Sequence, residues 1–300
     1  MVSAYPNTKW ISTFDGGNDD EAYCVVEAYD GGFALAGITN SFDHNNYDFW
    51  LIKTNEIGEE QWNMTYGESG DTRLMSMVRT DNSYVLAGSI KDQSNETWLD
   101  NNDDVWLVKT DSEGNILWNK TFGGSEYDRA KSIIVANDGG YVLACETRSF
   151  GGGGADFWLV KTDSDGVIEW NMTYGGEENE YGGSLVVDNN ENYWIACIQQ
   201  PTLGDGHFWL LETDLDGIVK SNQTYTISAH HSSTSIINTN NGDLAIVYSS
   251  RDSGEYRDIT LIVIENVKLN SIIPIILGVI VIFLIILFLV LYFKRKKYRI

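Results

Sequence analysis

Four aspartates recur just before an apolar, strand-like segment, and their spacing is the first feature of the sequence that suggests chemistry. The repeated text is DFWLIKT, DVWLVKT and DFWLVKT, with HFWLLET carrying His207 in the matching place. As a ring of carboxylates near one face, Asp48, Asp104, Asp156 and Asp258 could bind a cation or a sugar. Repetition favours the other interpretation, that each caps the N–H groups of a neighbouring turn, because architecture repeats whereas a catalytic site is normally asymmetric.

Three turns, 111–114, 163–166 and 214–217, run from an aspartate to a glycine through a second carboxylate. A calcium loop of the EF type needs a further liganding pair and a downstream glutamate. Because the spacing stops at glycine, we expect hairpin turns with a residue at positive φ, and neither a metal site nor another cofactor.

The loop 91–103, KDQSNETWLDNND, interrupts an otherwise regular repeat. Its Trp98 stands outside the repeat pattern, and binding residues favour loops that are held on a rigid scaffold. The sequence therefore predicts ligand binding by Trp98, Asp100 and Asp103.

No catalytic constellation is evident. A glycosidase needs two carboxyl groups about 5–10 Å apart, but 43 acidic residues will always provide such a pair, so abundance carries no information. No Ser-His-Asp pattern, phosphate loop or metal-ligand histidine pair is visible. The arginines occupy unmatched repeat positions (Arg73, Arg79, Arg129, Arg148, Arg251, Arg257). We therefore expect that the protein is not an enzyme.

Four tryptophans reveal the element that positions all of these residues. Trp10, Trp62, Trp118 and Trp170 are separated by 52, 56 and 52 residues, within the repeated text WNMTYG, WNKTFGG and WNMTYGG. The extra residues of the longer interval lie in the loop 91–103, where insertions belong. As repeated strand residues, these tryptophans are expected to pack between neighbouring units.

Each unit reads as four short strands, which in the third unit are predicted over 130–136, 141–145, 156–162 and 167–174. Val, Ile, Trp, Tyr and Thr dominate the strands, and Gly, Asn and Asp mark the turns. No helical period occurs between residues 1 and 268. Four-stranded units of 40 to 56 residues predict an all-β fold with the blades of a β-propeller.

The two ends of this domain, 1–265, predict how its ring closes. The chain opens with an isolated fourth strand at 7–17 and ends with three strands, 233–237, 244–248 and 258–264. Joining them gives about five four-stranded blades and removes the exposed edges. A fragment of a larger ring is the alternative. The units are roughly 10–61, 62–117, 118–169, 170–220 and 221–265.

The repeat resembles the tandem propeller repeats of bacterial and archaeal surface proteins in the quinoprotein-like superfamily. The resemblance rests on an acidic-glycine turn that leads to a tryptophan, as in TDSDGVIEW (162–170), and covers roughly residues 7–265. It is specific for architecture and weak for function. The quinone-dependent dehydrogenases of that superfamily use adjacent cysteines, and Cys24, Cys145 and Cys197 are not adjacent, so their activity is not carried over.

Sequons of the type Asn-x-Thr occur at the same point of successive units. If the domain is exported, they predict glycosylation. The other interpretation is that Asn and Thr simply alternate with buried residues and were copied with the repeat. The sequon asparagines are Asn63, Asn95, Asn119, Asn171 and Asn222.

The segment 272–293, from Ile272 to Phe293, contains no charged residue. A helix of this length spans about 30 Å, so we predict a single transmembrane helix after a short linker, 266–271. Five positive charges in the tail 294–300 place that side in the cytoplasm, against anionic lipid, and the propeller outside. The first residues, MVSAYPNTKW, are no signal peptide. Either the start lies upstream, or the protein is tail-anchored in the cytosol.

All 43 acidic residues precede position 270, together with only 15 of the 20 lysines and arginines. This field repels nucleic acid and excludes it as a partner. The leading prediction is a surface-displayed binding, adhesion or scaffolding module for an extracellular glycan or surface protein. A surface-anchored glycan hydrolase or lectin-like enzyme, and a tail-anchored cytosolic scaffold, are the alternatives.

Overall fold

The computed structural model describes residues 8–42, 46–67, 70–91, 102–201, 206–226, 234–251 and 257–264. This part of the chain forms nineteen strands in five antiparallel sheets, without a helix. None of its elements is a helix of the length and apolar character needed to cross a membrane. The predicted span 272–293 and the loop residues Trp98 and Asp100 lie outside the described residues.

Each sheet is one blade, with its strands in chain order. The first contains β1 (Asp20–Glu27), β2 (Phe33–Thr39), β3 (Asp48–Thr54) and β4 (Glu60–Tyr66). The second contains β5 (Thr72–Thr80), β6 (Ser83–Lys91), β7 (Asp103–Asp111) and β8 (Ile116–Phe122). The third contains β9 (Asp128–Val135), β10 (Tyr141–Thr147), β11 (Asp156–Thr162) and β12 (Ile168–Tyr174). The fourth contains β13 (Asn179–Val187), β14 (Tyr193–Gln200), β15 (His207–Thr213) and β16 (Val219–Thr226), and the fifth β17 (Thr234–Asn238), β18 (Leu244–Arg251) and β19 (Arg257–Ile264).

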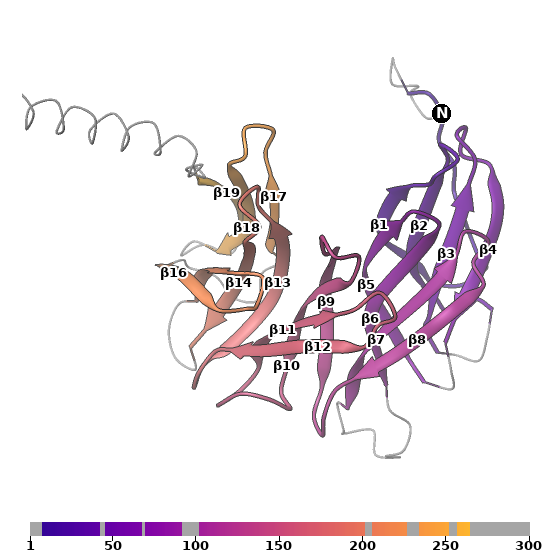
Figure 1. Ribbon diagram of the computed structural model, residues 1–300. Coiled ribbons are helices and arrows are strands. Elements are labelled where there is room, and N and C mark those ends of the chain that lie inside the picture. The colour runs from indigo at the N-terminus through magenta and orange to yellow at the C-terminus, as the bar shows by residue number, and fades with distance from the viewer. Residues whose placement is uncertain are drawn as a thin grey trace, which may run out of the picture.

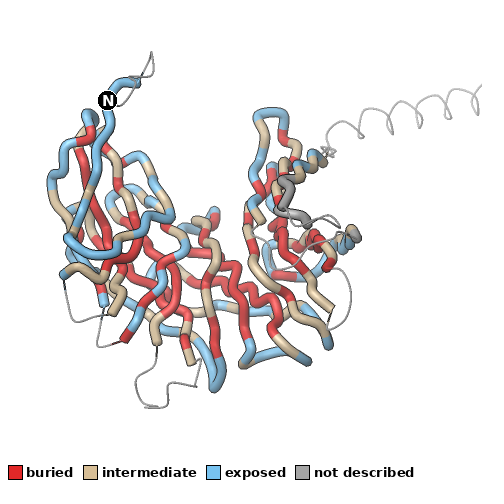
Figure 2. The backbone as a smooth tube through the Cα atoms, turned by 180° about the vertical axis from the view of Figure 1, so that it is seen from behind, coloured by how far each residue is buried: buried red, intermediate tan, exposed pale blue. Residues whose placement is uncertain are grey.

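The blades follow one another along a curved arc, with the first and the last at its two ends (Figures 1 and 2). Successive blades meet through their first strands, since β1 contacts β5, β5 contacts β9, β9 contacts β13, and β13 contacts β17. The prediction of an all-β fold built from five propeller-like sheets is therefore confirmed.

Closure of the ring by an N-terminal strand stays a prediction. The fifth blade has three strands in the described chain, and residues 8–19 do not form a strand. Trp10 lies against the first blade, 5.6 Å from Phe33 between ring centroids. Packing of this indole on the first blade holds the segment there.

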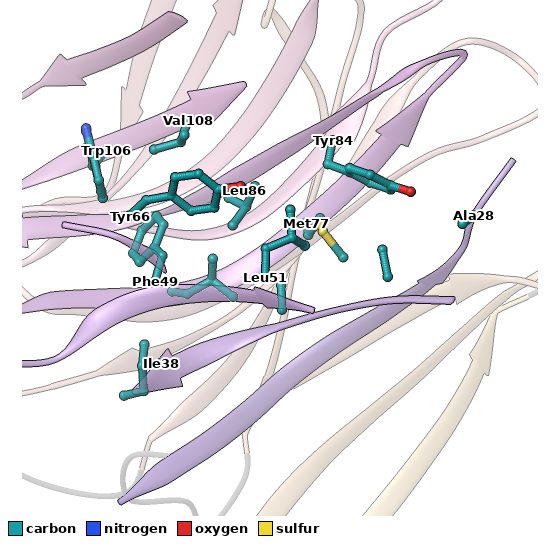
Figure 3. Packing of buried hydrophobic residues seen from close by; sticks show 13 residues of the cluster. Ala28, Ile38, Phe49, Leu51, Tyr66, Met77, Tyr84, Leu86, Trp106 and Val108 are labelled. Atoms are coloured by element: carbon teal, nitrogen blue, oxygen red, sulfur yellow. The ribbon is translucent and has the colours of Figure 1, made fainter. Parts of the chain in front are cut away.

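The core lies between neighbouring blades, and Figure 2 shows the buried residues concentrated in the middle strands. Every residue of β10 and β11 is buried, whereas the outer strand β12 is partly exposed. Figure 3 shows the cluster between the first two blades, where the ring centroids of Phe49 and Trp106 lie 4.8 Å apart. Burial on both faces of the middle strands explains their continuous apolar sequences.

Each repeated tryptophan of an outer strand covers a turn of the following blade. A Cβ on Gly114 would lie 2.9 Å from the ring of Trp62, and one on Gly166 would lie 2.9 Å from that of Trp118. These glycines also have positive φ values, 85° and 74°. A glycine is needed at this position both for its backbone conformation and for the approach of the indole.

Lysines of third strands are buried with their counter-charges. The Nζ of Lys161, which is 4% exposed, lies 2.7 Å from Asp138 Oδ2 and 2.6 Å from Glu169 Oε2. It also donates to the carbonyl of Thr162 at 2.9 Å. Lys53 is held in the same way by Asp30 in the first blade.

The first strands of four blades share an irregularity at one position. Pairing with the second strand skips Tyr23 in β1, Met75 in β5 and Lys131 in β9. In β13 it skips Gly182 and Gly183. Such β-bulges re-aim a side chain and are common beside active sites.

Candidate functional site

Of the aspartates at the start of the third strands, Asp156 is buried and Asp48 and Asp104 are half-buried, and each lies beside the glycine that follows the outer strand. Asp156 is 1% exposed, and its Oδ2 accepts a hydrogen bond from the N–H of Gly152 at 2.9 Å. A Cβ on Gly67 would overlap Asp48, and one on Gly123 would overlap Asp104. The side chain of Asp258 lies outside the described residues.

In the third and fourth blades this arrangement brings two carboxyl groups together. A Cβ on Gly175 would overlap both Asp156 Oδ1 and Glu180 Oε2, so these oxygens face the same point. Glu180 is 1% exposed, and its Oε1 accepts from Gln199 Nε2 at 2.9 Å. Neither Asp156 Oδ1 nor Glu180 Oε2 has a hydrogen-bond partner among the described residues. We call Asp156 and Glu180 the carboxyl pair.

Burial sets the protonation of this pair. Loss of hydration raises the pKa of Glu180 to about 7, and the charges of Asp156 and Glu178 act in the same direction. Burial also raises the pKa of Asp156, against the opposing hydrogen bond from Gly152. Two buried carboxyl groups close to each other cannot both ionise cheaply, so Glu180 takes up a proton near neutral pH rather than in the usual acidic range.

A second group of polar side chains lies at the inner end of the third blade. The hydroxyl of Tyr127 donates to Glu146 Oε1 at 2.8 Å, and Lys131 Nζ lies 2.9 Å from Glu146 Oε2. Burial, followed by the charge of Glu146, raises the pKa of Tyr127. Lys131 is the residue that the bulge of β9 leaves unpaired, and the bulge turns its side chain toward Glu146.

Two arginines complete this group. The Cζ atoms of Arg129 and Arg148 lie 4.5 and 4.9 Å from the ring centroid of Tyr127. Arg129 Nε donates to Asp103 Oδ2 at 2.8 Å, and the Nη2 of Arg129 lies 2.6 Å from the same oxygen. Hydrogen bonds to Tyr127 and Tyr181 raise the pKa of Arg148, although burial opposes them. The Tyr127 cluster consists of Asp103, Tyr127, Arg129, Lys131, Glu146 and Arg148.

The structure thus gathers one of the three residues predicted to bind a ligand, Asp103, into the Tyr127 cluster. Trp98 and Asp100 lie outside the described residues, as does the sequon asparagine Asn95. The first aspartate of an acidic-glycine turn stabilises the turn itself, since Asp163 Oδ1 accepts hydrogen bonds from the N–H groups of Asp165 and Val167. Across the described ranges, no group of three or more His, Cys, Asp or Glu side chains is placed to hold a metal ion.

The sequon asparagines of the outer strands have a structural partner. Asn63 Oδ1 accepts from Trp50 Nε1 at 3.2 Å, and Asn171 Oδ1 accepts from Trp158 Nε1 at 3.0 Å. Asn222 receives the same bond from Trp209. The repeated Asn therefore satisfies a buried indole N–H, while Asn119, Asn171 and Asn222 are exposed. Their glycosylation stays a prediction.

Sequence reasoning missed the carboxyl pair and most of the Tyr127 cluster. Comparison of the repeats contains a signal for both. Glu180 takes the position of Asp20 and Asp128, each of which accepts from the N–H of the glycine four residues before it. Arg148 stands where the first blade has Asn40 in the shared text Thr-x-Ser-Phe. Glu180 and Arg148 depart from the repeat, whereas Asp156 belongs to it, and Asp104 and Asp128 approach each other around Gly123 in the same way.

The comparisons with known proteins identify the fold. No family model and no curated protein sequence matches the chain. A protein of unknown function from Dyadobacter fermentans has a TM-score of 0.57 at 9% identity, over 81% of this chain and 79% of that one. The alpha-L-arabinanase of Penicillium chrysogenum, complexed with arabinobiose, has 0.55 at 11%, over 80% and 77%. The endo-arabinase of Bacteroides thetaiotaomicron has 0.52 at 10%, over 83% and 94%.

These findings correct two predictions. Two of these three similar folds are arabinan-cleaving enzymes. The predictions of a non-catalytic binding, adhesion or scaffolding module, and of a chain that is not an enzyme, are therefore wrong. The comparisons also support a β-propeller in general and give no support to the narrower quinoprotein-like resemblance.

Proposed function

We propose that this propeller hydrolyses glycosidic bonds in a glycan, with Glu180 as the proton donor. The observation that carries the proposal is a buried carboxyl group whose pKa is about 7. A general acid must keep its proton at the working pH, and glycosidases obtain this property by burial. Similarity of fold to an arabinanase that was solved with arabinobiose supports a carbohydrate as the substrate.

The proposed reaction uses two carboxyl groups in different states. Protonated Glu180 gives its proton to the glycosidic oxygen as the bond to the anomeric carbon breaks. Glu146, which is paired with Lys131, takes a proton from the water that attacks this carbon. The products are two shorter sugars, and the carboxyl groups exchange protons with solvent to return to their starting states.

The cover over Glu180 is compatible with access by a sugar. Gly175 and Gly176 are exposed and follow the outer strand β12, directly beside the carboxyl pair. Neither residue has a side chain that would stand between a substrate and Glu180. The Tyr127 cluster, next to Tyr181 through Arg148, then forms the adjoining part of the site.

Replacement of one oxygen tests the proposal. Glu180→Gln keeps the shape of the side chain and removes its acid, and is expected to lower kcat/KM about a hundredfold or more. The assay follows new reducing ends with arabino-, xylo- and galacturono-oligosaccharides. Glu177→Gln, an exposed carboxyl on the same connection, is the control and should leave turnover unchanged. Equal turnover by the Glu180→Gln variant, or no turnover of any of these glycans by the wild type, contradicts the proposal.

We also propose that the ring closes, with residues 8–14 as the fourth strand of the fifth blade. Trp10 supports this, because it lies on Gly58 as Trp62 lies on Gly114 and Trp170 on Gly217. The segment therefore occupies the place of an outer strand belonging to the blade before the first. In a ring, that blade is the fifth, whose β19 lacks a fourth strand in the described chain.

The cellular placement is a proposal of the same kind. The charge-free run 272–293 and the five positive charges of 294–300 support a single-pass anchor with the propeller outside. An external propeller would meet extracellular glycans, as the proposed activity requires. A membrane-impermeant protease applied to intact cells should remove the propeller, and protection until lysis would contradict this orientation.

A further inference from the structure

We infer that the glycan bound at the Tyr127 cluster carries a carboxylate, which Arg148 receives together with Arg129. This inference rests on the proposed function and names the class of its substrate. Acidic residues outnumber lysines and arginines by 43 to 15 before position 270. Three cations, Arg129, Lys131 and Arg148, nevertheless gather around Tyr127 and Glu146.

Two of these cations have a carboxylate partner and one does not. Arg129 is paired with Asp103 and Lys131 with Glu146. Arg148 interacts with the hydroxyl groups of Tyr127 and Tyr181, and it forms no ion pair with the described carboxylates. Its side chain is exposed. An arginine offers five N–H donors, so Arg148 keeps donors for a ligand after serving two hydroxyls.

The positions of the two guanidinium groups also favour an anion. Both lie within 5 Å of one ring centroid, at 4.5 and 4.9 Å, so their like charges repel each other. Asp103 offsets the charge of Arg129 alone. A ligand carboxylate would relieve the remaining repulsion, and its two oxygens match the planar fork of a guanidinium better than a neutral hydroxyl does.

Comparison with the first blade shows that the architecture does not require Arg148. The N–H of Arg148 donates to the carbonyl of Tyr127 at 2.9 Å, and the N–H of Asn40 donates to that of Asp19 at 3.3 Å. Both loops continue with Ser and Phe, and the serine N–H donates to the preceding threonine Oγ1 in each. The same loop therefore forms without an arginine or a tyrosine, so the backbone conformation does not account for these two side chains.

A binding measurement separates this inference from catalysis. The full-length chain carrying Glu180→Gln is held in detergent, and its affinity for a galacturonate hexamer is compared with that for the fully methyl-esterified hexamer. The two ligands differ mainly in charge. We expect the acidic hexamer to bind at least about tenfold more tightly at 0.15 M salt, and the preference to weaken as salt is raised.

The residue assignment is tested in the same variant background. Arg148→Gln should abolish the preference for the acidic hexamer and leave binding of the ester unchanged. The matched control is Arg79→Gln. Arg79 is an exposed arginine near the C-terminal end of β5 and is not part of the Tyr127 cluster, so this variant should keep the preference for the acidic hexamer. Equal affinity for the two hexamers, or a preference that survives Arg148→Gln, overturns the inference.

The outcomes for the two proposals are distinguishable. Arg148-dependent binding of the acidic hexamer without turnover of any glycan by the wild type contradicts the proposed hydrolysis and supports the inference. Turnover of neutral arabinan with no preference for the acidic hexamer supports the proposed hydrolysis and contradicts the inference.

Discussion

The indole ring of Trp10 covers Gly58, approaching to 2.5 Å the point where a Cβ on this glycine would stand. Gly58 belongs to the turn between β3 and β4, and Ser12 Oγ donates to its carbonyl at 2.7 Å. In the third blade, Trp170 and Met172 of the outer strand cover the equivalent Gly217. Ser12 therefore corresponds to Met172, which pairs with Leu159.

A disulfide at this position tests closure of the ring. The pairing of Leu244 with Ile264 matches that of Tyr141 with Thr162, so Leu261 corresponds to Leu159. In a closed ring Ser12 and Leu261 are directly opposed, at about 4.5–5.5 Å between Cα atoms, and cysteines there can bond. The variant Ser12→Cys with Leu261→Cys should form an intramolecular disulfide, seen as a mobility shift that reductant reverses. Ser12→Cys with Ile116→Cys should not cross-link. An open ring predicts no disulfide in either variant.

Two turn glycines separate the cost of a positive φ for alanine from the cost of a clash with an indole ring. Gly166 and Gly139 both have positive φ, 74° and 86°, but only Gly166 lies under a tryptophan. Gly139→Ala should lower the free energy of unfolding by about 1 kcal/mol, for the backbone conformation alone. Gly166→Ala adds a clash with Trp118 and should cost about 1–3 kcal/mol more. Equal losses in urea unfolding would show that the indole does not constrain this turn.

The carboxyl pair makes stability depend on pH in an unusual direction. The pKa of Glu180 rises from 4.5 to about 7 on folding, so between these values the native state binds more protons than the unfolded state. Stability contributed by Glu180 is therefore complete below pH 4.5, is lost as the pH rises to about 7, and is constant above it. The total loss is about 3 kcal/mol.

A comparison of variants isolates this contribution from the other carboxyl groups. The free energy of unfolding of the wild type and of Glu180→Gln is measured by urea unfolding at pH 5 and pH 8. The wild-type value relative to that of the variant should be lower at pH 8 than at pH 5. Glu177→Gln should follow the wild type at both values. A difference that is the same at both pH values would contradict the raised pKa of Glu180.

The buried Lys161 should show strong coupling between its two carboxylate partners. Asp138 and Glu169 are themselves about half exposed, with 57% and 47% of their side chains accessible, so each can be solvated when the other is lost. Asp138→Asn or Glu169→Gln alone should cost about 1 kcal/mol or less. The double variant leaves the ammonium without a counter-charge and should cost about 3–5 kcal/mol. Additive losses in a double-mutant cycle would contradict this coupling.

Local pattern predicts the strands of this fold well, because alternation and turn residues act over a few positions. The third strand of the third blade was expected over 156–162 and lies at Asp156–Thr162. The segment 7–17 was expected as a strand from its tryptophan, but residues 8–19 have no strand partner in the described chain. A strand needs hydrogen bonds from a distant segment, and the sequence pattern contains no information on whether that segment is near.

In the candidate site, one contact follows from pairing within a hairpin, and another depends on the packing of two blades. Tyr127 and Arg148 lie on connections of one hairpin, β9 and β10, so antiparallel register alone would bring them together. Asp156 and Glu180 belong to different blades, and their approach depends on how one sheet packs on the next. The repeated residues are explained by the architecture, whereas Glu180 and Arg148 depart from the repeat.

The bulges of the first strands have a consequence for how this protein can change. Tyr23, Met75, Lys131 and the pair Gly182–Gly183 occupy one equivalent position, and none of them takes part in the pairing with the second strand. Tyrosine, methionine, lysine and glycine thus all occur at a position that lies outside the pairing. Because the side chain at this position takes no part in the ladder, it can be exchanged in one blade with little effect on the strand pairing of that blade or of its neighbours.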